Sequence, residues 1–147
     1  MDLIVHATDG SAEAAEALDL AIELAKDTGA KLAVLSVHTP VPGGKGLAPP
    51  ISEVELPHGS QHLAEAAAAT ANAAGVDTKP YVATGEPAKE IVRLANELGA
   101  DLIVIGSRGF GGVRGALVGS VSRAVMTHST VPVTVVTSRA VREPARA

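Results

Sequence analysis

Length, composition and charge set the first limits on this chain. Its 147 residues suit a single domain, and a content of 46% hydrophobic but only 1% aromatic residues predicts a core of aliphatic side chains. The absence of cysteine excludes disulfides, a thiol nucleophile and cysteine-ligated metals. A net charge of −4, with Tyr81 and Phe110 as the only aromatic residues, argues against nucleic acid as a partner.

Strands and helices alternate along the sequence. Apolar runs that end at turn residues predict five strands, and apolar residues at helical spacing predict four helices. The first helix should be capped by Ser11 and should end at Gly29. The expected order is strand 3–7, helix 11–28, strand 31–37, helix 61–74, strand 77–83, helix 87–98, strand 102–105, helix 120–128 and strand 131–136.

Residues 39–60 interrupt this alternation. Five prolines and four glycines fall in this stretch, so we expect an irregular surface excursion with no long regular element. Near the other end, Pro132 lacks a backbone donor, which predicts that the last strand lies at a sheet edge. We expect one domain over residues 1–138 and a polar, frayed tail over 139–147.

No part of the sequence has the pattern of a targeting or membrane segment. The chain begins with a strand-like run, and no apolar stretch approaches the roughly 18 residues that a membrane span needs. We therefore expect a cytoplasmic protein that has neither a membrane nor nucleic acid as its partner.

The alternation of strands and helices predicts the architecture and the place of a binding site. It requires a doubly wound parallel sheet with helices on both faces, joined by right-handed crossovers. Such sheets bind ligands at the carboxyl ends of their strands, where the winding direction reverses. Asp9 and Gly106 each follow a predicted strand, so they are candidates for the two sides of one crevice.

The stretch from Leu102 to Val136 contains the most informative motif. An apolar strand ends in a glycine-rich loop, and Gly119-Ser120-Val121-Ser122 then begins a helix. Glycines let backbone N–H groups approach a ligand, and the first helical turn favours negative charge. The loop lacks the G-x-x-x-x-G-K-[ST] of P-loop proteins, and Arg114 stands where a dinucleotide fingerprint needs its third glycine.

The spacing Gly106-x2-Gly109-x9-Gly119-Ser120 resembles the nucleotide-binding pattern of the universal stress protein (UspA-like) family, in its ATP-binding subclass. Asp9-Gly10-Ser11, Gly85-Glu86-Pro87-Ala88 and the terminal Pro132-Val133 also match, so the resemblance covers essentially the whole chain. It implies an adenine nucleotide alpha hydrolase-like fold with five parallel strands in the order 3-2-1-4-5. It also implies a homodimer, which would form through the edge strand Val131–Val136.

The resemblance further implies ATP, ADP or AMP as the ligand, with Mg²⁺ or Mn²⁺ accompanying the phosphates. Asp9 and the backbone near Val37 would hold the adenine and ribose end. The ribose and α-phosphate would lie against the strand end, and the outer phosphates would lie against the helix start. The implied contact residues are Ala7, Thr8, Asp9, Val37, Ile105, Gly106, Arg108, Gly109, Gly119, Ser120, Val121 and Ser122.

Several residues have a simpler explanation beside the functional one. Asp9 is also a favoured turn or capping residue before the first helix. Arg108 and Arg114 are equally explained as solvated cations or as phosphate contacts. His58 and His62 lie four residues apart, but Gly59-Ser60 argue against a continuous helix there, so we interpret the histidines as structural or solvated.

Three functions remain open from the sequence. We favour an ATP-binding regulatory module that is not an efficient enzyme, because the loop contains no placed general base. A slow ATPase or adenylate hydrolase on the same fold is the enzymatic alternative, with at most weak ATP hydrolysis. The third possibility is a nucleotide-free interaction scaffold that uses the proline-rich excursion as its partner surface.

Overall fold

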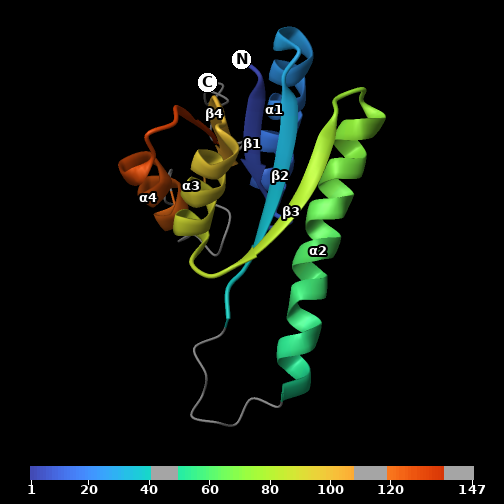
Figure 1. The fold of residues 1–147 in the computed structure, drawn as a ribbon, viewed down its shortest axis with the longest axis vertical. Helices are drawn as coiled ribbons and strands as arrows, with labels where there is room; N and C mark the ends of the chain where they lie inside the picture. Colours follow the sequence, from blue (N-terminus) through green and yellow to red (C-terminus); the bar gives the residue numbers. More distant parts are fainter. Residues whose placement is uncertain (41–49, 108–118, 138–147) are drawn as a thin grey trace, which may run out of the picture.

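Five parallel strands form one sheet in the computed structural model, which describes residues 1–40, 50–107 and 119–137 but not the side chains of 50–58 (Figure 1). The strand order is β3-β2-β1-β4-β5, and every neighbouring pair is parallel. The predicted fold class and strand order are therefore confirmed. The strands are β1 (Leu3–Ala7), β2 (Lys31–His38), β3 (Thr78–Thr84), β4 (Leu102–Gly106) and β5 (Val133–Val136).

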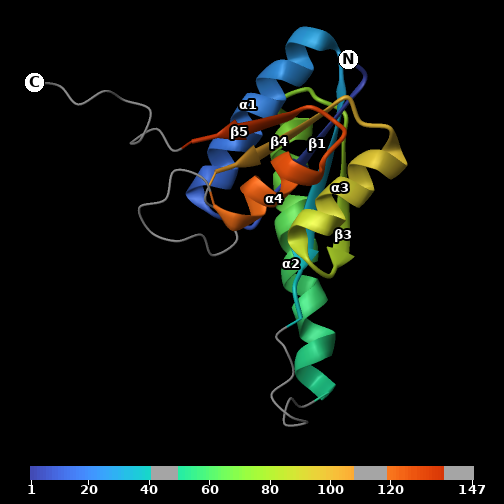
Figure 2. The same cartoon turned by 90° about the vertical axis from the view of Figure 1, so that its left-hand side faces the viewer.

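Helices cover both faces of this sheet (Figures 1 and 2). Alternate strand residues point to opposite faces, and each face has its own apolar cluster. One cluster lies beneath α1 and α2 and the other beneath α3 and α4. The helices are α1 (Ala12–Thr28), α2 (Pro50–Ala73), α3 (Pro87–Leu98) and α4 (Ser120–His128). No helix in the described part of the chain is long and apolar enough to cross a membrane.

Helix α2 begins much earlier than the sequence indicated. It starts at Pro50, so the prediction that residues 39–60 are irregular is wrong for 50–60, while 41–49 lie outside the described residues. Pro50 fits the first turn, where its missing N–H has no intrahelical partner to lose. Pro57 and Gly59 cost helix stability, about 3 and about 1 kcal/mol on intrinsic scales, but they do not forbid a helix. The first turns of α2 extend past the carboxyl ends of the strands (Figure 1).

The other boundaries agree with the sequence to within a residue or two. Ser11 caps α1, its side-chain oxygen accepting a hydrogen bond from the Ala14 N–H, and Gly29 ends that helix in the left-handed conformation. The last strand is shorter than predicted, because it begins at Val133 and Pro132 only precedes it. It lies at a sheet edge, as Pro132 indicated. The predicted tail over 139–147 lies outside the described residues.

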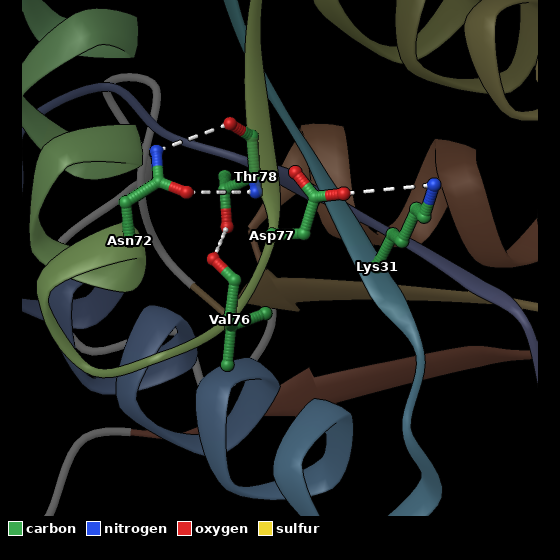
Figure 3. A network of polar contacts seen from close by, with 5 residues as sticks. All are labelled: Lys31, Asn72, Val76, Asp77 and Thr78. Carbon is green, nitrogen blue, oxygen red and sulfur yellow. Dashed lines mark hydrogen bonds and ion pairs between the residues drawn. The ribbon is translucent and has the colours of Figure 1, made fainter.

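A side-chain amide joins α2 to the edge strand β3 (Figure 3). Asn72 accepts a hydrogen bond from the Thr78 N–H at 3.0 Å and donates to the Thr78 carbonyl at 3.2 Å. The Asn72 amide thus pairs with β3 as a neighbouring peptide group would. The nearby ion pair between Lys31 and Asp77 spans 3.5 Å with both side chains about 70% exposed, so it contributes little.

Small residues let the helices lie close to the sheet, and Gly106 is at such a close contact. A Cβ atom at this position would lie 2.8 Å from the carbonyl carbon and 2.9 Å from the carbonyl oxygen of Glu13 in α1. These are backbone atoms, which cannot swing away as a side chain would. Gly106 therefore has no room for any side chain.

We predict opposite effects for two glycine-to-alanine substitutions. Gly106→Ala should lower the free energy of unfolding by about 1–3 kcal/mol, because the added methyl group overpacks the contact with α1. Gly59→Ala is the matched control, since nothing lies within 4 Å of its added Cβ in α2. It should raise the free energy of unfolding by about 1 kcal/mol. Urea denaturation measures both, and equal effects of the two substitutions would contradict the packing of Gly106.

Candidate functional site

The chain changes its winding direction between β1 and β4. Strands β2 and β3 follow on one side of β1, whereas β4 and β5 continue on the other side. Strand β1 pairs with β4 in a register that places His6 opposite Val104, so the two strands end at the same edge of the sheet. This edge is where an open parallel sheet binds its ligands. The predicted juxtaposition of Asp9 and Gly106 is therefore consistent with the strand order.

The turn after β1 satisfies its own backbone donors. The Thr8 side-chain oxygen accepts a hydrogen bond from the Gly10 N–H at 3.1 Å, and Asp9 Oδ1 accepts one from the Ser11 N–H at 2.9 Å. Gly10 has a φ of +82°, a conformation that favours glycine. The cap of α1 is Ser11, so Asp9 is a turn residue and not the cap. This turn role and a ligand role for Asp9 can hold together.

The end of β4 meets the beginning of α4 through three hydrogen bonds. The Gly119 N–H donates to the Ser107 carbonyl, and the buried Ser122 hydroxyl lies 2.7 Å from the Gly106 carbonyl oxygen and 3.1 Å from that of Ser107. Ser120 is exposed at the first position of the helix. The first-turn N–H groups of α4 and the Ser120 hydroxyl thus form a surface suited to an anion.

Four of the predicted apolar contact residues belong to one cluster. Ala7 and Ile105 are 1% exposed, and Val37 and Val121 pack partly buried against the same cluster beneath α3 and α4. Because Ala7 and Ile105 are buried in the core, their side chains are not available to a ligand. Arg108, Gly109 and Arg114 lie outside the described residues.

Two buried polar groups at this edge received no role from the sequence. In the described part of the chain, Ser107 Oγ and His6 Nε2 have no hydrogen-bond partner. Ser107 is 1% exposed and His6 is fully buried. The sequence feature that could have drawn attention to His6 is its position as a polar residue inside the apolar run of β1. Ser107 gave a weaker signal, since a serine that follows Gly106 at the start of a loop looks like an ordinary loop residue.

His6 bridges the two strands that form the crevice. Its Nδ1 lies 2.9 Å from the Val104 carbonyl oxygen, which identifies Nδ1 as the protonated nitrogen. Burial lowers the pKa of His6 to about 4, although the Val104 carbonyl and the charge of Asp9 act in the opposite direction. The ring is therefore neutral at neutral pH.

This lowered pKa predicts a specific loss of stability in mild acid. The unfolded chain takes up a proton near the ordinary pKa of 6.5, whereas the folded protein does so only near 4. The neutral His6 ring stabilises the fold fully above pH 6.5. As the pH falls towards 4, the free energy of unfolding decreases by about 3 kcal/mol because of this group. Denaturation from pH 4 to 7 should show this slope in the wild type and not in His6→Val. Parallel pH profiles for the two proteins would contradict the buried neutral ring.

A hollow of about 380 Å³ lies between α3 and α4. Its apolar lining includes Ala88, Val92 and Ala124. The cations at its rim are paired, Lys89 with Glu86, and Arg93 with Glu90 and Glu97. This hollow is less suited to an anion than the crevice. Among the described residues, no three side chains of His, Cys, Asp or Glu come together to hold a metal ion.

Comparison with known proteins identifies the family. The model of the universal stress protein family matches residues 1–137. This chain belongs to the universal stress protein family. The universal stress protein YxiE of Bacillus subtilis is 39% identical over 145 residues, which cover 88% of this chain and 95% of YxiE.

Two solved structures of family members contain nucleotides. A universal stress protein in complex with cAMP has a TM-score of 0.72 and 29% identity, covering 93% of this chain and 98% of that one. The universal stress protein of Archaeoglobus fulgidus in complex with dAMP has a TM-score of 0.67 and 28% identity, with the same coverage. The family resemblance of the sequence is therefore confirmed, and nucleotide binding occurs in related proteins.

Proposed function

We propose that this universal stress protein binds an adenine nucleotide, ATP in the first instance, in the crevice between β1 and β4 and acts as a regulatory module. The observation that carries the proposal is that two neighbouring strands, β1 and β4, each lead into a loop and a helix at the point where the chain reverses its winding direction. The Asp9 turn lies on one side, and the start of α4 lies on the other. Adenosine monophosphates are bound in related structures, which supports the adenine end of the ligand.

Each side of the crevice suits a different part of the nucleotide. Asp9 is half-buried and carries a carboxylate, an acceptor for the ribose hydroxyls or the adenine amino group. The first turn of α4 offers N–H groups and the exposed Ser120 hydroxyl to the phosphates. Mg²⁺ or Mn²⁺ would bind mainly through phosphate oxygens and water. The cytoplasmic location remains a prediction from the sequence.

We predict that the protein retains or binds adenine nucleotide with measurable affinity. Protein purified without added nucleotide is denatured, and the released molecules are identified by mass spectrometry. ATP is then titrated into the emptied protein by calorimetry. Asp9→Asn and Ser120→Ala should each weaken binding by about tenfold or more, the value of a hydrogen bond to a charged group. Asp27→Asn, an exposed substitution at the far end of α1, should not change it.

The same experiment separates the alternatives. Absence of released nucleotide together with absence of ATP binding would contradict the proposal and favour an interaction scaffold. Binding accompanied by ATP turnover that Asp9→Asn abolishes without loss of binding would favour the slow ATPase. Asp9→Asn keeps the side-chain oxygen that accepts from Ser11, so loss of binding would not merely report a broken turn.

We further propose a homodimer that forms through β5. This strand pairs only with β4 among the described strands, so its outer edge is open to a second strand. The carbonyls of Pro132 and Val136 accept hydrogen bonds from the N–H groups of Ile103 in β4 and of Ser107 directly after it. Because peptide groups alternate along a strand, those of Val133 and Val135 face the open edge.

This alternation gives a selective test of the dimer. Val135→Pro should remove an outward N–H while leaving the pairing with β4 intact, and should give a monomer in sedimentation experiments at micromolar concentration. Val135→Ala keeps the N–H and should remain dimeric. A monomeric wild type, or a dimeric Val135→Pro, would contradict the proposed interface.

A further inference from the structure

Serines 120 and 122 at the start of α4 occupy different environments, although the family resemblance implies that both contact the phosphates. Ser120 is exposed, whereas Ser122 is only 3% exposed. They are two residues apart, so they lie on different sides of the helix. The two hydroxyls are therefore not equally available to a ligand.

The single hydroxyl proton of Ser122 is already used in hydrogen bonding within the protein. It is directed at the Gly106 carbonyl oxygen at 2.7 Å, with the Ser107 carbonyl oxygen at 3.1 Å as a second acceptor. A serine hydroxyl has one donor and two lone pairs. With its proton directed at these carbonyls, the Ser122 hydroxyl can only accept a further hydrogen bond. An ionised phosphate oxygen has no proton to donate to it.

The carbonyls that Ser122 binds are themselves held in place. Gly106 is packed against the α1 backbone at Glu13, and the Ser107 N–H donates to the Val136 carbonyl of β5. The Ser107 carbonyl also accepts the Gly119 N–H. Ser122 and Gly119 thus attach the first turn of α4 to a rigid part of the sheet.

We propose that Ser122 is a positioning residue, which fixes the first turn of α4 against the end of β4 and leaves Ser120 as the serine hydroxyl that contacts the phosphates in the proposed function. The assignment of Ser120 rests on the proposed nucleotide site. The positioning role of Ser122 concerns the nucleotide-free protein as well. The two roles can therefore be tested separately.

The test compares Ser122→Ala, Ser122→Thr and Ser122→Val with Ser120→Ala. The first measurement is hydrogen exchange of the Gly119 amide in nucleotide-free protein. Ser122→Ala and Ser122→Val should speed this exchange by about tenfold, the equivalent of one lost hydrogen bond. Ser122→Thr keeps a hydroxyl and should restore the wild-type rate, while the isosteric valine should not. Ser120→Ala should leave the rate unchanged.

The second measurement is the affinity for AMP and for ATP. Because the first turn of α4 contacts only the outer phosphates in the proposed site, Ser122→Ala should weaken ATP more than AMP. Ser120→Ala should also weaken ATP more than AMP, since it removes a contact with the outer phosphates, but it should do so without changing the exchange of the Gly119 amide.

The positioning role is overturned if Ser122→Ala leaves Gly119 exchange unchanged, or if Ser120→Ala speeds that exchange as much as Ser122→Ala does. If Ser122→Ala does not fold, the threonine variant decides, because it must keep the wild-type exchange rate and both affinities. If the wild type binds neither nucleotide, the proposed function fails, and the exchange measurement still tests the positioning role.

Discussion

The backbone of α1 touches the backbone of β4 at Gly106, and the architecture of the crevice depends on that contact. Only glycine allows the helix to lie this close to the strand. The contact brings the beginning of α1, and with it the Asp9 turn, over the end of β4. It also fixes the Gly106 carbonyl, to which Ser122 of α4 binds. A glycine that the family motif assigns to the nucleotide is thus required by packing even without a ligand.

Buried polar side chains gather at the same edge of the sheet. Of the six buried polar residues described, only Thr78 lies near the amino end, and the others are His6, Thr8, Ser36, Ser107 and Ser122. Two of them, His6 and Ser107, keep an atom without a partner in the described part of the chain. Burial of polar atoms without a partner costs stability, and both of these atoms lie at the edge where we propose the nucleotide site.

Much of the fold could be predicted from local patterns. Apolar runs identified all five strands, and Gly29 and Gly99 marked helix ends that adopt the left-handed conformation. The start of α2 could not be found this way, because the proline and glycine signals at Pro57 and Gly59 are outweighed by the helix that continues through them. The intrinsic helix propensity of one residue does not reveal how much the rest of the chain stabilises the helix around it.

The candidate site also has features that the sequence predicted and features that it could not. The motif located the edge of the sheet, because strand ends and glycine spacing are local features. The hydrogen bonds of the Ser122 hydroxyl could not be predicted, since its acceptors lie 15 and 16 residues away in the sequence and their positions depend on tertiary packing. His6 was equally hidden, because its environment is set by Val104 on a strand distant in the sequence. The ligand contacts remain predictions, and Arg108 and Gly109 lie outside the described residues.

The most direct measurement of the central claim is an NMR titration of the labelled protein with ATP, read at each backbone amide. If the nucleotide binds between β1 and β4, the largest shift changes should fall on Gly10, Gly106, Gly119 and Ser120. Amides that line the hollow between α3 and α4, such as Lys89 and Ala124, should change little. Changes concentrated in that hollow, with the strand ends unaffected, would contradict the assignment of the crevice.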